Sequence, residues 1–340
     1  MTKQFLALLI LILSSGVLMP MLSQEINGQS ELPAHFNGNR IFVQPVTEYG
    51  DTLNLLHDTG GGTIFVTREA VEKLDLEIEG DTFSDSRMEL TRFPKFNVED
   101  DIPWFPDSFS SKDALYLSEK VEFLNGRIPV MPSNPQYPME IFGDGLLGNE
   151  WFATRIWTFD YLQDKLILHH TFEKHTAHSD HCIFIFFPKE QDRYIRYFPR
   201  IVAEIDGEEF SFLFDTGATL ILSDDSRQQL SDDLPAVRGT SYITESVFQK
   251  WRLNNPEWKV IKNAEQFTGA HLIRVPEVTI AGHTVGPVWF TTRPDPAFRQ
   301  HMSGMMDRQI EGALGGSLFQ YFRITVNYQG EYAIFERSVD

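Results

Sequence analysis

The chain has 340 residues, a formal net charge of −19 and a single cysteine, Cys182. Its shares of 42% hydrophobic and 23% charged residues are typical of a globular protein and exclude a disordered chain. The excess of 48 acidic over 29 basic residues argues against nucleic acid and anionic membrane surfaces as partners. A lone cysteine excludes an internal disulfide and a thiolate zinc site.

The N-terminal segment predicts export. Residues 4–24 carry no charge, and the run Phe5–Leu13 is strongly apolar, with Lys3 before it and Pro20 after it. This order is typical of a secretory signal peptide over residues 1–23, but the stretch is also nearly long enough for a membrane anchor. Both alternatives stay open. Either one makes the protein periplasmic, secreted or outward-facing on the cell membrane, with the membrane as a partner only through that anchor.

The next part of the chain predicts a β-rich lobe. Its short apolar runs are rich in Val, Ile, Phe and Thr and lie at residues 40–46, 52–57 and 63–66. The tripeptide Asp58-Thr59-Gly60 follows the second run, and Thr67 is a good N-cap for a short helix. The segment Leu146-Leu147-Gly148 comes later and leads into a helical stretch and a hairpin.

A second copy with the same order of elements follows. Its strands are predicted at residues 201–205, 209–214 and 219–222. Its tripeptide is Asp215-Thr216-Gly217, its N-cap is Ser223 and its later segment is Ala313-Leu314-Gly315. An internal repeat is one structural unit built twice, so we expect two similar lobes, at residues 35–168 and 183–340.

The linker between the copies is expected at residues 169–182. It holds five of the ten histidines of the chain, next to Cys182. A solvated connector and a metal-binding tract are both compatible with such a composition.

The repeated tripeptide suggests a chemistry. An Asp at the end of an apolar strand, followed by Gly, is a carboxylate held at a tight turn, where glycine allows φ angles that other residues avoid. Packing of the lobes about a pseudo-two-fold axis would bring Asp58 and Asp215 together. Two close carboxylates cannot both ionise freely, so one keeps its proton. The ionised one can then act as a base on water while the protonated one polarises a carbonyl, with no metal or cofactor.

These residues resemble the bilobal aspartic proteases, with lobes closer to retropepsins than to pepsin. The resemblance covers about residues 40–337 and is carried by four segments: Leu55–Gly60, Phe212–Ala218, Leu146–Gly148 and Ala313–Gly315. It implies an all-β fold of two pseudo-two-fold related β-barrel lobes, with the active site in the cleft between them. It further implies that Asp58 and Asp215 are the catalytic residues.

The resemblance also assigns supporting roles. Thr59 and Thr216 would bond across to the backbone of the opposite lobe, and the dyad would be supported further by Gly60, Gly217 and Ala218. Two strands would thread behind the dyad, and their residues would be Leu147, Gly148, Leu314 and Gly315.

The implied function is that of an aspartic endopeptidase. It would act as a monomer on peptide or protein substrates with apolar residues around the cleaved bond. Two alternatives stay open: a protease restricted to one partner or to itself, and a catalytically silent peptide-binding or scaffold protein of the same fold.

Some features depart from pepsin-like enzymes. Gly61 and Ala218 stand where those enzymes carry Ser or Thr, so one hydrogen bond to each carboxylate is missing. A less stabilised anion predicts activity at weakly acidic to neutral pH. His57 precedes Asp58 on a strand, so its ring is expected to point away from that carboxylate. A structural histidine and electrostatic tuning of the dyad both remain open for it.

The flap over the site is a separate question. Candidate hairpins lie at Glu79–Arg87 and Val237–Ile243, where Gly80 and Gly239 would supply flexibility. Trp104 and Tyr116, in a long insertion of the first copy, are rival coverings.

Overall fold

The computed structural model describes residues 23–25, 28–83, 86–96, 126–134, 138–170, 173–175 and 180–338. Nearly all of the predicted N-terminal signal or anchor, together with Trp104 and Tyr116, lies outside these described residues. Within the described part, no helix has the length and apolar character needed to cross a membrane.

The first lobe is built on a sheet of eight described strands in the order β3-β4-β5-β10-β6-β9-β8-β7. Three short helical segments flank it. The elements, in chain order, are β3 Ala34–Asn37, β4 Arg40–Val43, β5 Leu55–His57, β6 Phe65–Thr67, α1 Arg68–Lys73, β7 Glu79–Phe83, β8 Ser86–Thr91, β9 Ile128–Met131, η2 Met139–Phe142, β10 Gly145–Leu147 and α3 Asn149–Phe152.

The second lobe is built on a sheet of nine described strands in the order β22-β23-β26-β21-β27-β18-β17-β24-β25. Its elements are β17 Arg200–Ile205, β18 Glu208–Phe214, β19 Thr219–Ile221, α4 Asp224–Leu230, β20 Val237–Gly239, β21 Ser241–Thr244, α5 Glu245–Asn254, β22 Val260–Ile261, β23 Leu272–Val275, β24 Val278–Ile280, β25 His283–Val285, β26 Val288–Arg293, η3 Ala297–Met302, η4 Ser303–Met305, β27 Gly312–Leu314 and α6 Gly316–Phe319.

The two lobes share one strand order, which identifies their equivalent elements. The series β5-β10-β6-β9-β8-β7 in the first lobe has the counterpart β18-β27-β21-β26-β23-β22 in the second. Each helix after the tripeptides begins as expected, because the hydroxyls of Thr67 and Ser223 accept bonds from backbone N–H groups of α1 and α4. However, β21 and α5 are the counterparts of β6 and α1, so β19-α4-β20 is an addition to the second lobe.

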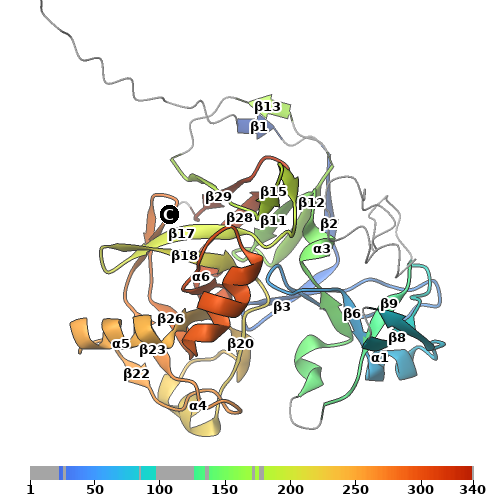
Figure 1. The fold of residues 1–340 in the computed structure, drawn as a ribbon, viewed down its shortest axis with the longest axis horizontal. Coiled ribbons are helices and arrows are strands. Elements are labelled where there is room, and N and C mark those ends of the chain that lie inside the picture. Colours follow the sequence, from blue (N-terminus) through green and yellow to red (C-terminus); the bar gives the residue numbers. More distant parts are fainter. Residues whose placement is uncertain are drawn as a thin grey trace, which may run out of the picture.

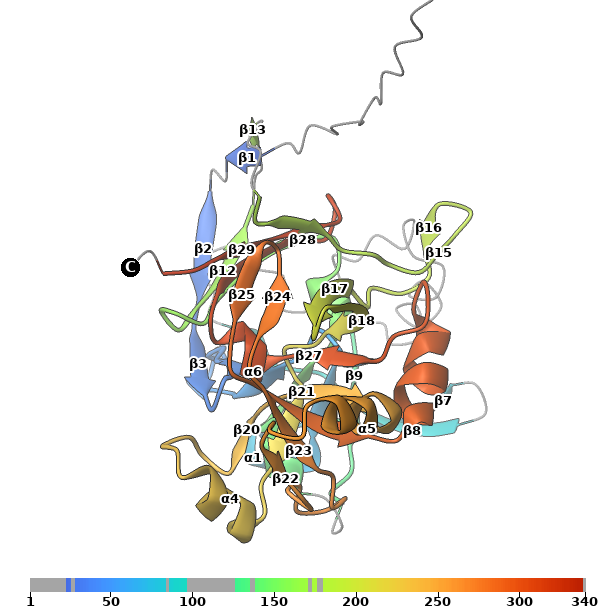
Figure 2. The same ribbon diagram turned by 90° about the vertical axis from the view of Figure 1, so that its left-hand side faces the viewer.

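A third sheet joins the lobes. Its order is β14-β29-β28-β11-β12-β2, with β2 Gln29–Leu32, β11 Ile156–Asp160, β12 Lys165–His169, β14 Cys182–Phe184, β28 Arg323–Asn327 and β29 Tyr332–Glu336. The hairpins predicted at the ends of the two copies pair here, with Thr158 of β11 opposite Thr325 of β28. This joining sheet lies in the upper part of Figures 1 and 2, and in Figure 1 α1 and α5 lie on opposite sides below it.

The linker prediction needs a correction at both ends, and at its last residue Cys182 begins β14 of the joining sheet. His169 ends β12, is 4% exposed, and its Nε2 lies 2.7 Å from the hydroxyl of Thr158 within the joining sheet. It is therefore a buried sheet residue, and the connection between lobes lies after it. Four short strands complete the structure: β1 Ser23–Glu25, β13 Glu173–His175, β15 Lys189–Glu190 and β16 Arg193–Tyr194.

Candidate active site

Equivalent strands deliver Asp58 and Asp215 to the space between the lobes. In the first lobe β10 runs parallel to β5, with Leu147 opposite His57, and in the second lobe β27 runs parallel to β18 with Leu314 opposite Phe214. The backbone N–H of Asp58 donates to the carbonyl of Leu147 at 3.0 Å, and that of Asp215 donates to Leu314 at 2.9 Å. The predicted strands behind the two turns are thus hydrogen-bonded to the aspartates themselves.

The residue that follows β10 and the residue that follows β27 must each be glycine, because a neighbouring backbone carbonyl leaves no room for a side chain. A Cβ atom on Gly148 would lie 2.2 Å from the carbonyl oxygen of Thr63, and one on Gly315 would lie 2.3 Å from that of Thr240. Non-bonded carbon and oxygen atoms need well over 3 Å, so no side chain fits at either position.

The carboxyl groups of Asp58 and Asp215 are hydrogen-bonded to each other. Each is also held by its own turn: Gly60 N–H donates to Oδ1 of Asp58 at 2.9 Å, and Gly217 N–H donates to Oδ1 of Asp215 at 3.1 Å. The backbone of Ala218 adds a further hydrogen bond to Asp215. The two aspartates predicted from the repeat are therefore brought together as a pair.

Glycine in the two tripeptides serves a purpose that we did not expect. Neither Gly60 nor Gly217 adopts the left-handed φ that the sequence suggested. Instead, a Cβ atom on Gly60 would lie 2.6 Å from Cγ of Asp215, and one on Gly217 would lie 2.1 Å from Cγ of Asp58. The glycines are needed because each turn packs against the carboxyl group of the opposite lobe.

Burial and mutual repulsion change the acidity of the pair. Asp215 is 9% exposed, and its pKa is raised well above the usual range, first by burial and then by the charge of Asp58. Burial also raises the pKa of Asp58, against the lowering effect of its hydrogen bonds. The pair therefore retains one proton at a pH where isolated carboxyl groups are ionised.

The two threonines connect the lobes beneath the aspartates. Thr59 Oγ1 donates to the carbonyl of Phe214 at 2.7 Å and accepts from the N–H of Thr216 at 3.0 Å. In the reverse direction, Thr216 Oγ1 lies 3.2 Å from the carbonyl of His57 and accepts from the N–H of Thr59 at 3.1 Å. We call this set of reciprocal hydrogen bonds the threonine grip; it fixes the two turns relative to each other.

His57 is part of this arrangement, although the sequence only marked it as a neighbour of Asp58. Its ring is fully buried, and its Nδ1 lies 2.7 Å from the hydroxyl of Thr216 in the other lobe. Aromatic rings of Trp151, Phe152 and Phe159 surround it. Burial lowers the pKa of His57 to about 3, so the ring is neutral above that pH.

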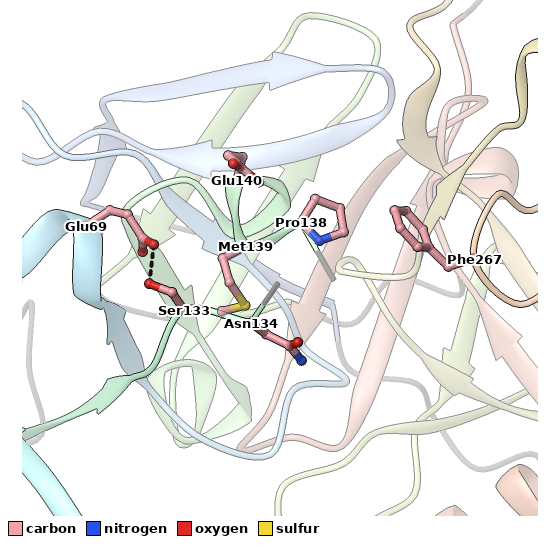
Figure 3. Close-up of a pocket in the computed structure, with 7 residues that line it drawn as sticks. All are labelled: Glu69, Ser133, Asn134, Pro138, Met139, Glu140 and Phe267. Atoms are coloured by element: carbon pink, nitrogen blue, oxygen red, sulfur yellow. Dashed lines mark hydrogen bonds between the residues drawn. The ribbon is translucent and has the colours of Figure 1, made fainter. Parts of the chain in front are cut away.

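A pocket of about 410 Å³ lies between residues of the two lobes. Its first-lobe residues come from α1, η2 and the segment before η2, and they include Glu69, Ser133 and Met139. Phe267 of the second lobe reaches the pocket from the opposite side (Figure 3). This aromatic side chain is 45% exposed and was not singled out from the sequence, where it is one of 28 phenylalanines.

The loop that carries Phe267 connects β22 and β23 and is held by Glu265. The carboxylate of this buried residue accepts hydrogen bonds from the N–H of Phe267 at 3.1 Å and from the N–H and hydroxyl of Thr268. The loop therefore presents an exposed aromatic ring from a fixed backbone.

One flap candidate is a hairpin and the other is not. Glu79–Arg87 falls on β7 and β8, which pair with Gly80 opposite Glu89. The second candidate, Val237–Ile243, is wrong, because β20 and β21 belong to different sheets and Ser241 and Ile243 are fully buried. The second-lobe counterpart of β7-β8 is β22-β23, the hairpin that carries Phe267.

In the described part of the chain, no group of three or more His, Cys, Asp or Glu side chains could hold a metal ion. Of the histidine-rich tract, His181 stacks on His283 with ring centroids 3.8 Å apart.

Two all-β lobes, a sheet that joins them and an aspartate pair between them are the arrangement that the resemblance to bilobal aspartic proteases implied. No protein-family model and no curated protein matches the sequence. Solved structures do match it. A retropepsin-like aspartic protease from Rickettsia conorii is 16% identical, with 45% of this chain and 89% of that chain covered and a TM-score of 0.27.

Two further structures match over most of the chain. The aspartic proteinase from Irpex lacteus is 11% identical, with coverage of 91% and 97% and a TM-score of 0.46. Conglutin gamma, a basic 7S globulin from lupine seeds, is 8% identical, with coverage of 93% and 96% and a TM-score of 0.41.

Proposed function

We propose that the protein is an aspartic endopeptidase that cleaves peptide bonds with the pair Asp58 and Asp215. The observation that carries this proposal is the pair itself: two carboxyl groups from different lobes are hydrogen-bonded to each other and share burial that favours one proton between them. A structural ion pair would need a cation. Two carboxyl groups in hydrogen-bond contact are instead suited to acid–base catalysis.

The chemistry needs no covalent intermediate. The ionised carboxylate takes a proton from a water molecule while the protonated carboxyl donates its proton to the carbonyl oxygen of the peptide bond. The oxygen of that water attacks the carbonyl carbon and forms a neutral tetrahedral diol. Collapse of the diol returns a proton to the dyad, transfers one to the leaving nitrogen and breaks the carbon–nitrogen bond. At the end of the cycle the dyad again holds one proton, as it did at the start.

The substrate is proposed to be a peptide or an unfolded protein segment that lies between the lobes. Phe267 and Met139 would supply apolar contact on opposite sides of the pocket there. We also propose that the protein acts outside the cytoplasm, on the basis of the apolar N-terminal stretch. Both proposals follow from the sequence and the pocket, and neither rests on the structural comparisons.

The test compares wild type, Asp58→Asn and Asp215→Asn on a library of fluorescence-quenched peptides, with and without a statine-containing inhibitor. General acid and general base catalysis each contribute roughly 10²–10⁴-fold, so each substitution should reduce kcat by at least about 10²-fold. Asp307→Asn is a control, because that carboxylate pairs with Arg200 within the second lobe and is not part of the dyad.

The outcomes separate the alternatives. Cleavage that survives both dyad substitutions would contradict the proposal. A wild type that binds the immobilised inhibitor or the peptides but cleaves none of them would instead identify a silent peptide-binding protein of this fold.

A further inference from the structure

The feature that goes beyond the dyad is the contact between His57 and Thr216. The threonine grip has two equivalent halves, but they are not chemically equal. The two hydroxyls lie 3.4 Å apart and each meets the backbone of the opposite lobe, but only that of Thr216 also meets a ring nitrogen, Nδ1 of His57, at 2.7 Å. The contact is shorter than the 3.2 Å between the same hydroxyl and the carbonyl of His57.

The equivalent position in the second lobe shows what the ring nitrogen adds. Phe214 occupies it, and its ring packs on Phe319 of α6 with centroids 4.4 Å apart. His57 contacts Phe152 of α3 with centroids 4.2 Å apart, but edge-on at an interplanar angle of 65°, whereas Phe214 and Phe319 are stacked at 28°. Both sites thus hold a flat ring against a phenylalanine of the following helix, and the first-lobe ring also has a polar edge that faces Thr216.

Counting donors indicates the direction of the hydrogen bond. The hydroxyl of Thr216 has one proton and accepts from the N–H of Thr59. If it donates to the carbonyl of His57, as Thr59 does to Phe214, then Nδ1 of His57 must carry the proton and donate to the hydroxyl. The alternative places the proton on Nε2, which is buried without a hydrogen-bond partner. A buried N–H without a partner is costly, so the Nδ1–H form satisfies more groups.

We propose that His57 is a positioning residue of the active site, whose ring N–H holds the hydroxyl of Thr216 and thereby fixes the turn that carries Asp215. Asp215 immediately precedes Thr216 in this turn, so a displacement of the hydroxyl moves the carboxyl group that must meet Asp58. The proposal rests on the proposed function and assigns His57 no contact with the substrate.

The kinetic test uses the natural difference between the lobes. His57→Phe places at this site the residue of the equivalent position, so the variant should fold. Loss of positioning should lower kcat by between about tenfold and a hundredfold and leave KM within about twofold, because the residue does not touch the substrate. His57→Asn, whose side-chain N–H takes the place of Nδ1–H, should recover a large part of kcat.

His169→Phe is the matched control. This second buried histidine also contacts a threonine hydroxyl at 2.7 Å, but in the joining sheet and away from the grip. Its substitution should leave kcat unchanged. A kcat of His57→Phe equal to that of the wild type, or a fall of the same size in His169→Phe, would overturn the proposal.

A second measurement does not depend on activity. Long-range ¹⁵N–¹H correlation spectra of the histidine side chains should show His57 as the neutral Nδ1–H form in the wild type, and its Nδ1 signal should shift in Thr216→Val. An Nε2–H form that is unaffected by Thr216→Val would overturn the inference whatever the activity. A wild type with the expected spectra but no cleavage of any peptide would overturn the proposed function and the catalytic part of this inference, so the two failures are distinguishable.

Discussion

Gly217 of the second lobe lies so close to Asp58 of the first that a Cβ atom on it would be 2.1 Å from the carboxyl carbon. The relationship is reciprocal, with Gly60 against Asp215 at 2.6 Å. Each turn therefore forms one wall of the site for the opposite carboxyl group. The absence of a side chain is what allows the two aspartates to meet.

This relationship predicts a steep penalty for Gly217→Ala. The added methyl group must displace the carboxyl group of Asp58, so we expect kcat to fall by at least about 10²-fold and the free energy of unfolding to fall by roughly 1–3 kcal/mol. Gly62→Ala, in the loop just after the first tripeptide, is the control, because a Cβ atom there would meet nothing within 4 Å. Peptide cleavage rates and urea unfolding check both; equal behaviour of the two variants would refute the steric explanation.

The threonine grip predicts unequal costs for its two halves. Thr59→Val should reduce the free energy of unfolding by roughly 1–3 kcal/mol, because it leaves the buried N–H of Thr216 without an acceptor. Thr216→Val should cost more, since it also leaves the ring of His57 unpaired. Urea unfolding measures both variants, with Thr279→Val as a control at an exposed Thr–Thr contact. Equal losses at both grip positions would show that the histidine contact adds nothing.

The dyad predicts a stability that declines with rising pH. The pKa of Asp215 is raised above its ordinary value of 3.8, mainly by burial, so the folded state binds the proton more tightly than the unfolded chain does. This contribution is fully present below the unfolded pKa and is lost as the pH rises through the folded pKa. Asp215→Asn removes the titration, so its stability relative to wild type should grow between pH 4 and pH 8. Parallel stability curves across that range would contradict the raised pKa.

His57 has the opposite dependence. Burial lowers the pKa of His57 from 6.5 to about 3, so the folded state favours the neutral ring. The stabilisation of the neutral form is complete above the unfolded value of 6.5 and is lost as the pH falls toward 3. We therefore expect His57→Phe to lose less stability than wild type between pH 7 and pH 4 in urea unfolding. The loss of folding stability at acid pH agrees with the expectation of activity at weakly acidic to neutral pH. An activity optimum below about pH 3 would contradict that expectation.

Phe267 predicts a substrate-binding effect without a folding effect. Because its side chain is 45% exposed and lines the pocket between the lobes, Phe267→Ala should raise KM by about threefold to tenfold. The thermal midpoint should hardly change, because little buried surface is lost. Phe184→Ala is the matched control: this side chain is 49% exposed on β14 of the joining sheet. A similar KM for both variants would place the peptide elsewhere.

Much of this architecture could be read from the sequence because it is repeated. The equivalence of Asp58 with Asp215 and of Leu147 with Leu314 follows from two copies of one pattern. Strands were also predicted close to where β4, β5, β17 and β18 lie. Helix starts at Thr67 and Ser223 were also predictable, since an N-cap is a local signal. What repetition cannot show is where the copies differ. The sequence pattern of the added unit β19-α4-β20 resembles that of β6 and α1. The second flap was therefore predicted at β20 and β21, before the hairpin β22-β23 that is the counterpart of β7-β8.

The sequence alone therefore determined the all-β class, the two lobes and the two aspartates, because apolar periodicity and a repeated motif are local properties of the chain. Only the tertiary structure decided how the lobes meet. The need for Gly60 and Gly217, the contact of His57 with Thr216 and the place of Phe267 all depend on atoms from opposite lobes. Such contacts join residues far apart in the sequence, as between Thr59 and Thr216 with a separation of 157, and no local pattern encodes them.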